Sequence, residues 1–473
     1  MTLLKQKNAG ASTAKIALWY IISNVFGKGL AVISTPIFTR IMSKTEYGLF
    51  SNITSWESVL TVLVTLDLIS SIARAKYDFD EKMEEYLSSI LALSNVVTLF
   101  TYFAVELKPA FFVKLFGMDI FYIRVLFVYL LFMPAFNFLQ IKHRIYQKYK
   151  FCVVASMGSA IVRTGVSIVL VMLMDNKLMG RTIGYFLPVS LLNFAFWIYI
   201  MYKGRKISWN CIKYACKISI PLIPHDLAGI LLGSVDKIMI TNYCGSEENA
   251  LYSVAYTISM LAYVVQTSMN QAWTPWLFDK FHEKDEKEIR KNSNIYMGVY
   301  AVIILGVFLV APEVIYVLGG KAYYSAKYAM PPIILGCAYQ FFYTFYVNIE
   351  IFKKRTFTIS IGTVAAALLN IFLNWLFIPK FGYLAAAYTT MIGYLALLGF
   401  HYWIVRRTAK EFDGVYNKKF LALTIVGLTF AGMGMLGLYR VLTLRIIFLV
   451  IYVVVLSLSL IHISEPTRLR CIS

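Results

Sequence analysis

Apolar residues occur in fourteen stretches of membrane-spanning length that account for nearly all of the 473 residues. The polar loops between these stretches are mostly short. A helix that crosses the hydrocarbon core of a bilayer needs about 20 mostly apolar residues, and each stretch has roughly that length. The pattern therefore predicts an all-α integral membrane protein with about 14 transmembrane helices, at residues 16–41, 47–73, 86–107, 119–141, 151–174, 178–202, 218–241, 249–278, 292–318, 328–352, 357–378, 382–405, 420–439 and 443–461.

The composition argues against a water-soluble fold. Hydrophobic residues make up 59% of the chain and charged residues only 15%, and the mean hydropathy is +0.67. Soluble domains carry about 25% charged residues. A chain this apolar could not hide its hydrophobic surface from water.

The net charge of +20 does not indicate a nucleic-acid partner, because lysine and arginine are concentrated in alternate loops. If the N-terminus is cytoplasmic, thirty of the 45 basic residues lie on the inner side and eleven on the outer side. This asymmetry follows the positive-inside rule. With an even number of spans, both termini are predicted to be cytoplasmic.

The six cysteines lack the spacing of a disulfide framework or a metal site. No motif for a cofactor is evident either, so we expect neither a metal nor a cofactor. Residues 462–473 break off the last helix and resemble translated adaptor DNA more than a native tail. We interpret them as non-native, with a short natural terminus as the alternative.

Two weak internal matches suggest that the chain contains a repeat. Arg40 corresponds to Lys237, 197 residues later, and the loop 146–151 resembles the loop 352–357, 206 residues later. Six helices intervene, so both copies keep the same orientation in the membrane. We predict two parallel six-helix lobes around a central cleft, organised as an N-lobe (1–202), a cytoplasmic linker (203–217), a C-lobe (218–405), two extra helices (406–461) and the tail (462–473).

Three stretches resemble the polysaccharide-biosynthesis (O-antigen type) flippases of the multidrug/oligosaccharidyl-lipid/polysaccharide exporter superfamily. They are Pro36–Phe50, Ser219–His225 leading to Asp236-Lys237, and Ala367–Thr390. The likeness in helix pattern covers residues 10–460. The chain departs from the family at Leu384, where glycine is usual, and at Lys237, where arginine is common.

The resemblance implies a transporter that moves undecaprenyl-diphosphate-linked oligosaccharide from the inner to the outer leaflet of the bacterial cytoplasmic (inner) membrane. Alternating access to a cleft between the lobes would carry the substrate across. The implied partners are the polyprenyl-diphosphate-linked oligosaccharide, membrane lipids and polysaccharide polymerase machinery.

Four cations are candidates for binding the substrate diphosphate. A charged side chain at membrane depth costs at least a few kcal/mol, so it should face a cleft or a partner. Lys28 lies on a narrow polar stripe of its helix, and Arg163 is flanked by serines at near-helical spacing, with no acidic residue nearby in the sequence. A lysine that snorkels to an interface or pairs with a carboxylate is the alternative for Lys28. The candidate set is Lys28, Arg40, Arg163 and Lys237.

Asp67, His225 and Asp226 are weaker candidates for ion coupling. Asp67 lies inside a predicted span, where it could hold a proton or sodium ion or form an ordinary ion pair. His225 and Asp226 follow two prolines and could titrate near physiological pH. A capped helix start near the cytoplasmic surface is the favoured alternative. Glu350 precedes the basic run 353–355 and is interpreted as a surface partner of that run.

Two other classes of function are alternatives to a flippase. A membrane enzyme such as a glycosyltransferase is disfavoured, because no catalytic motif and no large aqueous loop is evident. A multidrug or other small-molecule exporter could share the fold, but cationic drugs favour acidic clefts and the candidate residues here are mainly basic. The charge of the candidate residues alone does not distinguish an oligosaccharide-lipid flippase from a lipid II flippase.

Overall fold

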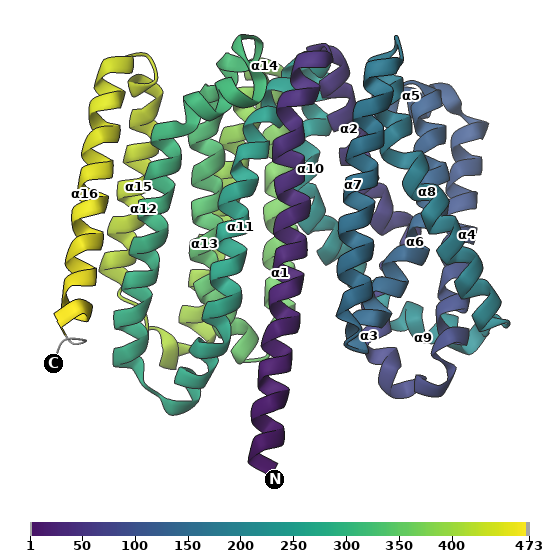
Figure 1. Cartoon of the computed structure of the whole chain (residues 1–473), viewed down its shortest axis with the longest axis horizontal. Helices are drawn as coiled ribbons and strands as arrows, with labels where there is room; N and C mark the ends of the chain where they lie inside the picture. The colour runs from purple at the N-terminus through teal and green to yellow at the C-terminus, as the bar shows by residue number, and fades with distance from the viewer. Residues whose placement is uncertain (1, 470–473) are drawn as a thin grey trace. The chain divides into compact units, whose positions relative to one another are not determined.

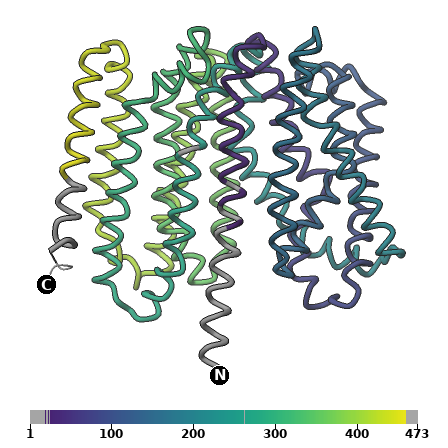
Figure 2. Tube along the Cα trace, viewed as in Figure 1, coloured from purple at the N-terminus to yellow at the C-terminus, as the bar shows by residue number. Residues whose placement is uncertain are grey.

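The computed structural model describes the backbone of residues 2–469. It describes the side chains of residues 19–458 except Tyr20, Ile21, Asn24 and Leu261. The tail 462–473 lies outside the described side chains, and its last four residues lie outside the described backbone. The described chain is built of helices (Figure 1), and Figure 2 follows the same chain as a trace.

The chain divides into two compact units. Unit 1 contains residues 1–253 and 360–386, and unit 2 contains residues 254–359 and 387–473. The helices wholly within unit 1 are α1 (Thr2–Ile41), α2 (Lys44–Thr65), α3 (Ile69–Asp78), α4 (Met83–Leu107), α5 (Pro109–Phe116), α6 (Ile120–Ile145), α7 (Tyr149–Leu173), α8 (Lys177–Gly204), α9 (Trp209–Ser219) and α10 (Ile223–Cys244).

Unit 2 holds four whole helices, which are α12 (Glu286–Gly319), α13 (Met330–Phe352), α15 (Lys418–Leu438) and α16 (Leu442–Leu469). Helices α11 (Ser246–Glu283) and α14 (Thr356–Thr408) each contribute residues to both units. Short 3-10 helices complete the order at Asp80–Lys82, Ile220–Leu222, Lys321–Ala329 and Lys410–Phe412.

The predicted all-α membrane fold is confirmed. Ten helices in the described part of the chain are long and apolar enough to cross a membrane. Helix α14 has 53 residues and breaks at Gly382, where φ is +66°, so it comprises two helices. With α1, α13 and α16, these elements account for the 14 helices expected.

One predicted helix is interrupted. The span expected at 47–73 is split into α2 and α3, because Leu66 and Asp67 adopt left-handed backbone angles with φ of 50° and 49°. Residues other than glycine rarely adopt these angles, which cost of order 1–3 kcal/mol each. Hydropathy could not reveal this break, since apolar residues continue across it.

Three helices of unit 1 begin at a side-chain cap. At the start of α2, the Ser43 hydroxyl accepts from the backbone N–H of Glu46, whose carboxylate accepts from the Ser43 backbone N–H. Asp119 and Asn176 similarly accept from the first turns of α6 and α8. These caps satisfy N–H groups that would otherwise lack partners at a helix end.

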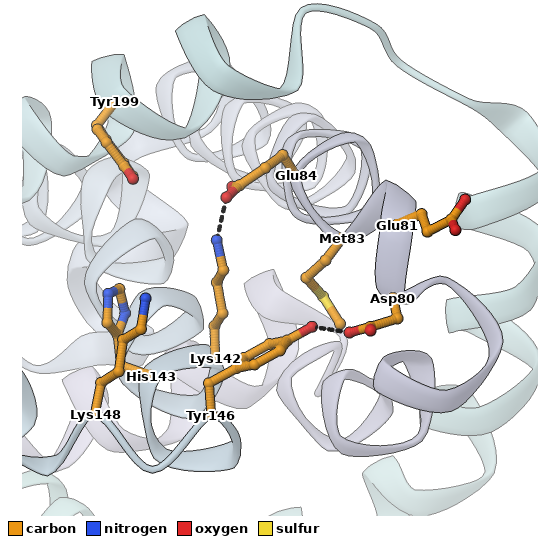
Figure 3. Close-up of a pocket in the computed structure, with 9 residues that line it drawn as sticks. All are labelled: Asp80, Glu81, Met83, Glu84, Lys142, His143, Tyr146, Lys148 and Tyr199. Atoms are coloured by element: carbon orange, nitrogen blue, oxygen red, sulfur yellow. Dashed lines mark hydrogen bonds and ion pairs between the residues drawn. The ribbon is translucent and has the colours of Figure 1, made fainter.

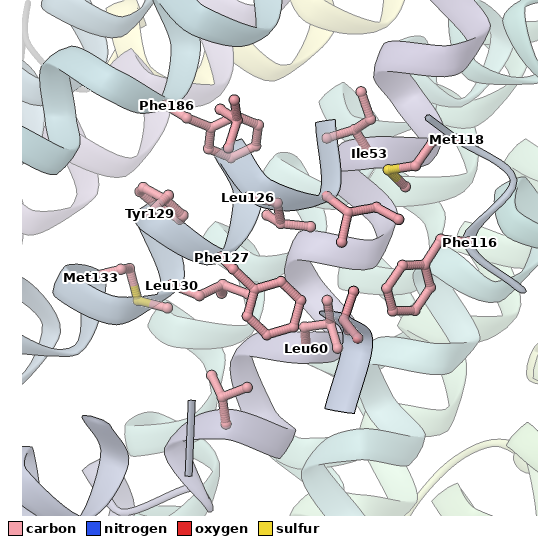
Figure 4. Close-up of a cluster of buried hydrophobic side chains, with 14 of the residues drawn as sticks. Ile53, Leu60, Phe116, Met118, Leu126, Phe127, Tyr129, Leu130, Met133 and Phe186 are labelled. Carbon is pink, nitrogen blue, oxygen red and sulfur yellow. The ribbon is translucent and has the colours of Figure 1, made fainter. Parts of the chain in front are cut away.

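One core cluster of unit 1 consists of buried apolar side chains mainly from α2, α5, α6 and α8 (Figure 4). Ile53 and Leu60 of α2 pack in the same cluster as Leu126 of α6 and Phe186 of α8. Each of these side chains is at most 4% exposed. This core fixes the relative positions of α2, α6 and α8, which carry three of the side chains that meet at the site described below.

The starts of α2 and α11 pair with each other at a constant offset. The Ser51 and Ser253 hydroxyls lie 2.6 Å apart, and the Thr45 hydroxyl donates to Glu247 over 3.1 Å. Both pairs join positions 202 residues apart. When a two-fold axis relates two copies of a repeat, equivalent positions of the two copies contact each other at the axis. The offset falls between the 197 and 206 residues of the sequence matches.

Gly48 allows this close approach. A Cβ at Gly48 would overlap the carbonyl oxygen of Ser246 and would lie 3.1 Å from the backbone nitrogen of Ala250. Backbone atoms cannot move aside as a flexible side chain can. Small residues permit such approaches between membrane helices.

We expect Gly48→Ala to lower the free energy of unfolding by about 1–3 kcal/mol, the usual cost of overpacking. The measurement is thermal unfolding of the purified full chain in detergent. Gly158→Ala on α7 is the matched control, because a Cβ there meets nothing within 4 Å. Equal melting temperatures for the two variants would contradict the close packing of α2 against α11.

Candidate functional site

Arg163 of α7 lies where side chains from three other helices converge. Its guanidinium is 4.0 Å from the carboxylate of Glu57 on α2 and donates to the Tyr129 hydroxyl on α6 over 3.2 Å. The guanidinium carbon also lies 4.2 Å from the ring centroid of Tyr185 on α8. The side chains of Arg163 and Glu57 are 21% and 15% exposed. Helices α2, α6, α7 and α8 thus hold one cation between a carboxylate and two aromatic rings.

Sequence reasoning missed Glu57. Arg163 has no acidic neighbour in the sequence, but the fold brings Glu57 to it from 106 positions earlier. One signal was available: Glu57 is itself an ionisable residue inside an apolar span, which requires a partner or a cavity. A separation of 4.0 Å makes a loose ion pair that leaves guanidinium N–H groups able to bind another acceptor.

The other predicted cations occupy three different positions. Lys28 of α1 is half-buried, and α1 packs along α7, the helix of Arg163. Arg40 is exposed in the last turn of α1 and donates to the Pro36 carbonyl over 2.9 Å. Lys237 of α10 is half-buried and follows the buried Asp236. The structure thus puts Lys28 and Arg163 on neighbouring helices.

Asp236 is held by hydrogen bonds from two other helices. It is 1% exposed and accepts from the Tyr252 hydroxyl over 2.5 Å and from the Asn374 amide over 2.6 Å. Asn374 also donates to Asn370 over 3.1 Å. Residues of α10, α11 and the first half of α14 therefore meet at one carboxylate within unit 1. The sequence marked Asp236 only as part of a motif.

Two of the three predicted ion-coupling residues lie together. Asp67, at the break between α2 and α3, is 6% exposed, and Asp226 of α10 lies within hydrogen-bonding reach of its carboxyl group. One oxygen of Asp67 is buried without a partner among the described residues. Nδ1 of the adjacent His225 is likewise buried and unpartnered in that part of the chain. Two carboxyl groups this close require a shared proton or a cation.

A cavity of about 280 Å³ opens in unit 1 among the ends of α4, α6 and α8 (Figure 3). Lys142 forms an ion pair with Glu84 across it, and the Tyr146 hydroxyl donates to Asp80. Burial and the neighbouring Asp80 raise the pKa of Tyr146 to about 12. The lining carries both signs of charge, unlike the set of basic residues expected for a diphosphate site.

The expectation that Glu350 is a surface partner of residues 353–355 is wrong. Glu350 is 1% exposed and lies 2.5 Å from Nδ1 of His401. Lys353 instead forms an ion pair with Glu411, whose pKa is lowered by the hydrogen bond from Lys353. Glu350 ends α13 with its side chain turned into unit 2, a direction that sequence order alone could not give.

The comparisons with known proteins agree with this architecture. The family described as "Polysaccharide biosynthesis protein" matches residues 13–282. An uncharacterized membrane protein of Methanocaldococcus jannaschii is 27% identical over 239 residues, covering 48% of this chain. The match spans 44% of that relative's length.

Solved structures show the same fold at low sequence identity. The lipid II flippase MurJ in an inward closed conformation has a TM-score of 0.71 and 15% identity, covering 94% of this chain and all of that one. An inward-facing multidrug resistance MATE transporter has a TM-score of 0.56 and 15% identity, with 84% and 95% covered. A transporter of Pyrococcus furiosus from the same superfamily has a TM-score of 0.53 and 16% identity, with 84% and 95% covered.

The family match covers more than half of the chain and both sequence segments that supply Asp67 and Asp226. The solved structures share the helical fold of this chain. The chain therefore belongs to the family described as "Polysaccharide biosynthesis protein".

Proposed function

We propose that this chain moves a polyprenyl-diphosphate-linked oligosaccharide across the bacterial cytoplasmic membrane, with both termini in the cytoplasm. The observation that carries the proposal is Arg163, a guanidinium held inside unit 1 by Glu57 and two tyrosines. A guanidinium binds phosphate through two parallel hydrogen bonds, which an ammonium group cannot match. The family description, "Polysaccharide biosynthesis protein", supports a saccharide-bearing substrate.

Glu57 fits this role better than an unpaired arginine would. A charge buried without a partner is expensive, so the empty transporter needs a counter-ion for Arg163. The loose 4.0 Å contact lets a diphosphate compete with Glu57 for the guanidinium. Release of the substrate then restores the internal pair, so neither state buries a lone cation. Lys28, Arg40 and Lys237 are proposed as further contacts for the anionic substrate.

Asp67 and Asp226 are proposed as the site where a cation couples to transport, with His225 beside them. They come from the two predicted lobes, 1–202 and 218–405. A proton or sodium ion between the carboxyl groups removes their repulsion and holds α10 to the break after α2. Loss of that cation lets the two segments separate, which is the motion that alternating access requires.

Purified full-length protein in lipid vesicles tests the substrate. Polyprenyl-diphosphate-linked oligosaccharide, lipid II and a fluorescent cationic drug are offered in parallel, and the fraction that reaches the opposite leaflet is measured. We expect flipping of the oligosaccharide lipid above the protein-free rate and little drug movement. Faster flipping of lipid II would favour that alternative, and drug movement alone would overturn the proposal.

The double variant Asp67→Asn with Asp226→Asn tests ion coupling. An ion gradient imposed across the vesicle membrane should no longer accelerate flipping of the oligosaccharide lipid in this variant.

A further inference from the structure

Glu350 and His401 form a buried pair within unit 2. They are 1% and 0% exposed, and Glu350 Oε1 lies 2.5 Å from Nδ1 of His401. The other carboxylate oxygen of Glu350 accepts from the Thr358 hydroxyl. Glu350 lies in the last turn of α13, Thr358 in the first turn of α14, and His401 in the second half of α14. One carboxylate thus ties together three helical segments.

The hydrogen bonds determine where protons lie in this pair. An ionised carboxylate can only accept, so the proton of the short contact is on Nδ1 of His401. The opposite ring nitrogen, Nε2, is buried and has no hydrogen-bond partner among the residues that the structure describes. The Tyr343 ring stacks on the imidazole, with centroids 5.6 Å apart. Nε2 of a neutral imidazole is therefore an enclosed proton acceptor beside an anion.

We propose that Glu350, His401 and Thr358 form a proton-binding site that makes transport depend on pH. A proton from the aqueous phase binds Nε2 of His401 and gives an imidazolium, while Nδ1–H continues to donate to Glu350. The charge of the pair changes from −1 to zero in this step. No other bond is made or broken.

The location suggests how the proton acts on the rest of the chain. Thr358 immediately precedes the point, between residues 359 and 360, at which the chain passes from unit 2 into unit 1. In the anionic pair, Glu350 has its full charge to accept the bond from Thr358. Once His401 is an imidazolium, its positive charge attracts the same carboxylate and competes with Thr358 for it. Proton binding therefore weakens the hold on the start of α14, whose continuation enters unit 1.

The charged groups nearby already have other contacts. Lys353 pairs with Glu411, and Asp413 pairs with Lys418. Arg355 contributes backbone groups: its N–H donates to the Glu350 carbonyl, and its own carbonyl oxygen lies 2.7 Å from the Thr358 hydroxyl, whose single proton it shares with the Glu350 carboxylate. Tyr402 of the same helix as His401 packs against Tyr346. The ion pairs and the ring contact of these side chains thus join them to residues other than Glu350 and His401.

Proton binding can be measured without any transport substrate. The full chain, with ¹⁵N-labelled histidine, is placed in lipid nanodiscs and its imidazole signals are followed from about pH 5 to 8, where imidazoles change charge. Of the five histidines, His401 is identified by the loss of its signal in His401→Asn. We expect this signal to gain the doubly protonated form as the pH falls. A signal that keeps one protonation state throughout would overturn the site.

Flipping at equal pH on both sides of the vesicle tests the consequence. We expect the rate of the unsubstituted chain to change by about tenfold across that range, as one titrating group allows. His401→Asn keeps an N–H donor for Glu350 but has no second nitrogen, so its rate should vary less with pH than that of the unsubstituted chain. Thr358→Val keeps the proton acceptor, so its histidine signal should still titrate while its rate shows the same reduced pH dependence as His401→Asn.

These readouts separate this inference from the proposed substrate. The inference rests on the proposed transport function only in the flipping experiment, because proton binding is measured without a transport substrate. A titrating His401 without flipping of the oligosaccharide lipid would support the proton site and count against the substrate. Flipping with the same pH profile in His401→Asn would overturn the proposed role of the site. Thermal unfolding of each variant shows whether the fold is retained.

Discussion

Export of lipid-linked oligosaccharide is expected to fall to background when Arg163 is replaced by Gln. The amide has similar size but no charge, so it cannot attract a diphosphate away from Glu57. Charge-assisted hydrogen bonds of this kind contribute about 1.5–3 kcal/mol each, and losing two would reduce binding by roughly 100-fold or more. Arg163→Lys should be intermediate, because lysine keeps the charge and loses the paired hydrogen bonds.

The measurement is surface polysaccharide in a strain that lacks its own flippase, with the amount of membrane protein determined alongside. Arg124→Gln is the matched control, since Arg124 pairs with Glu106 near the surface and its side chain is 53% exposed. The double variant Glu57→Gln with Arg163→Gln removes the buried carboxylate left alone by the single change. It should regain stability but not export. Full export from Arg163→Gln combined with Lys28→Gln would show that both cations are structural.

The second large effect is expected at Asp236. Replacing it by Ala removes the carboxylate that accepts hydrogen bonds from the Tyr252 hydroxyl and the Asn374 amide. A hydrogen bond to a charged group contributes about 1.5–3 kcal/mol, so losing two should lower the free energy of unfolding by roughly 3–6 kcal/mol. Asp236→Asn keeps one acceptor oxygen and should fall by about half as much.

Thermal unfolding of the purified chain measures this loss. Asp175→Ala serves as the control, because Asp175 is exposed in the loop between α7 and α8, and surface changes usually stay within about 0.5 kcal/mol. Equal melting temperatures for Asp236→Ala and Asp175→Ala would show that the Asp236 hydrogen bonds do not hold α10, α11 and α14 together.

The helices could be predicted from the sequence because each span must be long and apolar on its own. The breaks could not be predicted so directly. Leu66 and Asp67 interrupt an apolar run through backbone angles that hydropathy does not encode. The extra short helix α5 (Pro109–Phe116) also lies in a segment that was expected to be a loop. Hydropathy therefore predicts which helices exist but does not predict where they end or bend.

The candidate site was harder to predict because its contacts join distant residues. Arg163 and Lys28 stood out as charges at membrane depth, but the partners of such charges depend on how helices pack. Glu57 reaches Arg163 from another helix, and His401 reaches Glu350 from 51 positions away. The sequence therefore led to a wrong expectation for Glu350 and to none for Glu57, although the cost of burying a charge applies to both residues.

The division into two units has a consequence for biosynthesis. Unit 1 takes up residues 360–386 only after the intervening part of unit 2 has been made. Asn374 follows Asp236 by 138 residues, and ribosomes add about 5–20 residues per second. Asp236 thus emerges roughly 7–28 seconds before one of its hydrogen-bond donors exists. During that interval the nascent chain must be inserted with this carboxylate incompletely satisfied, which makes the interval a point at which an insertase or membrane chaperone would act.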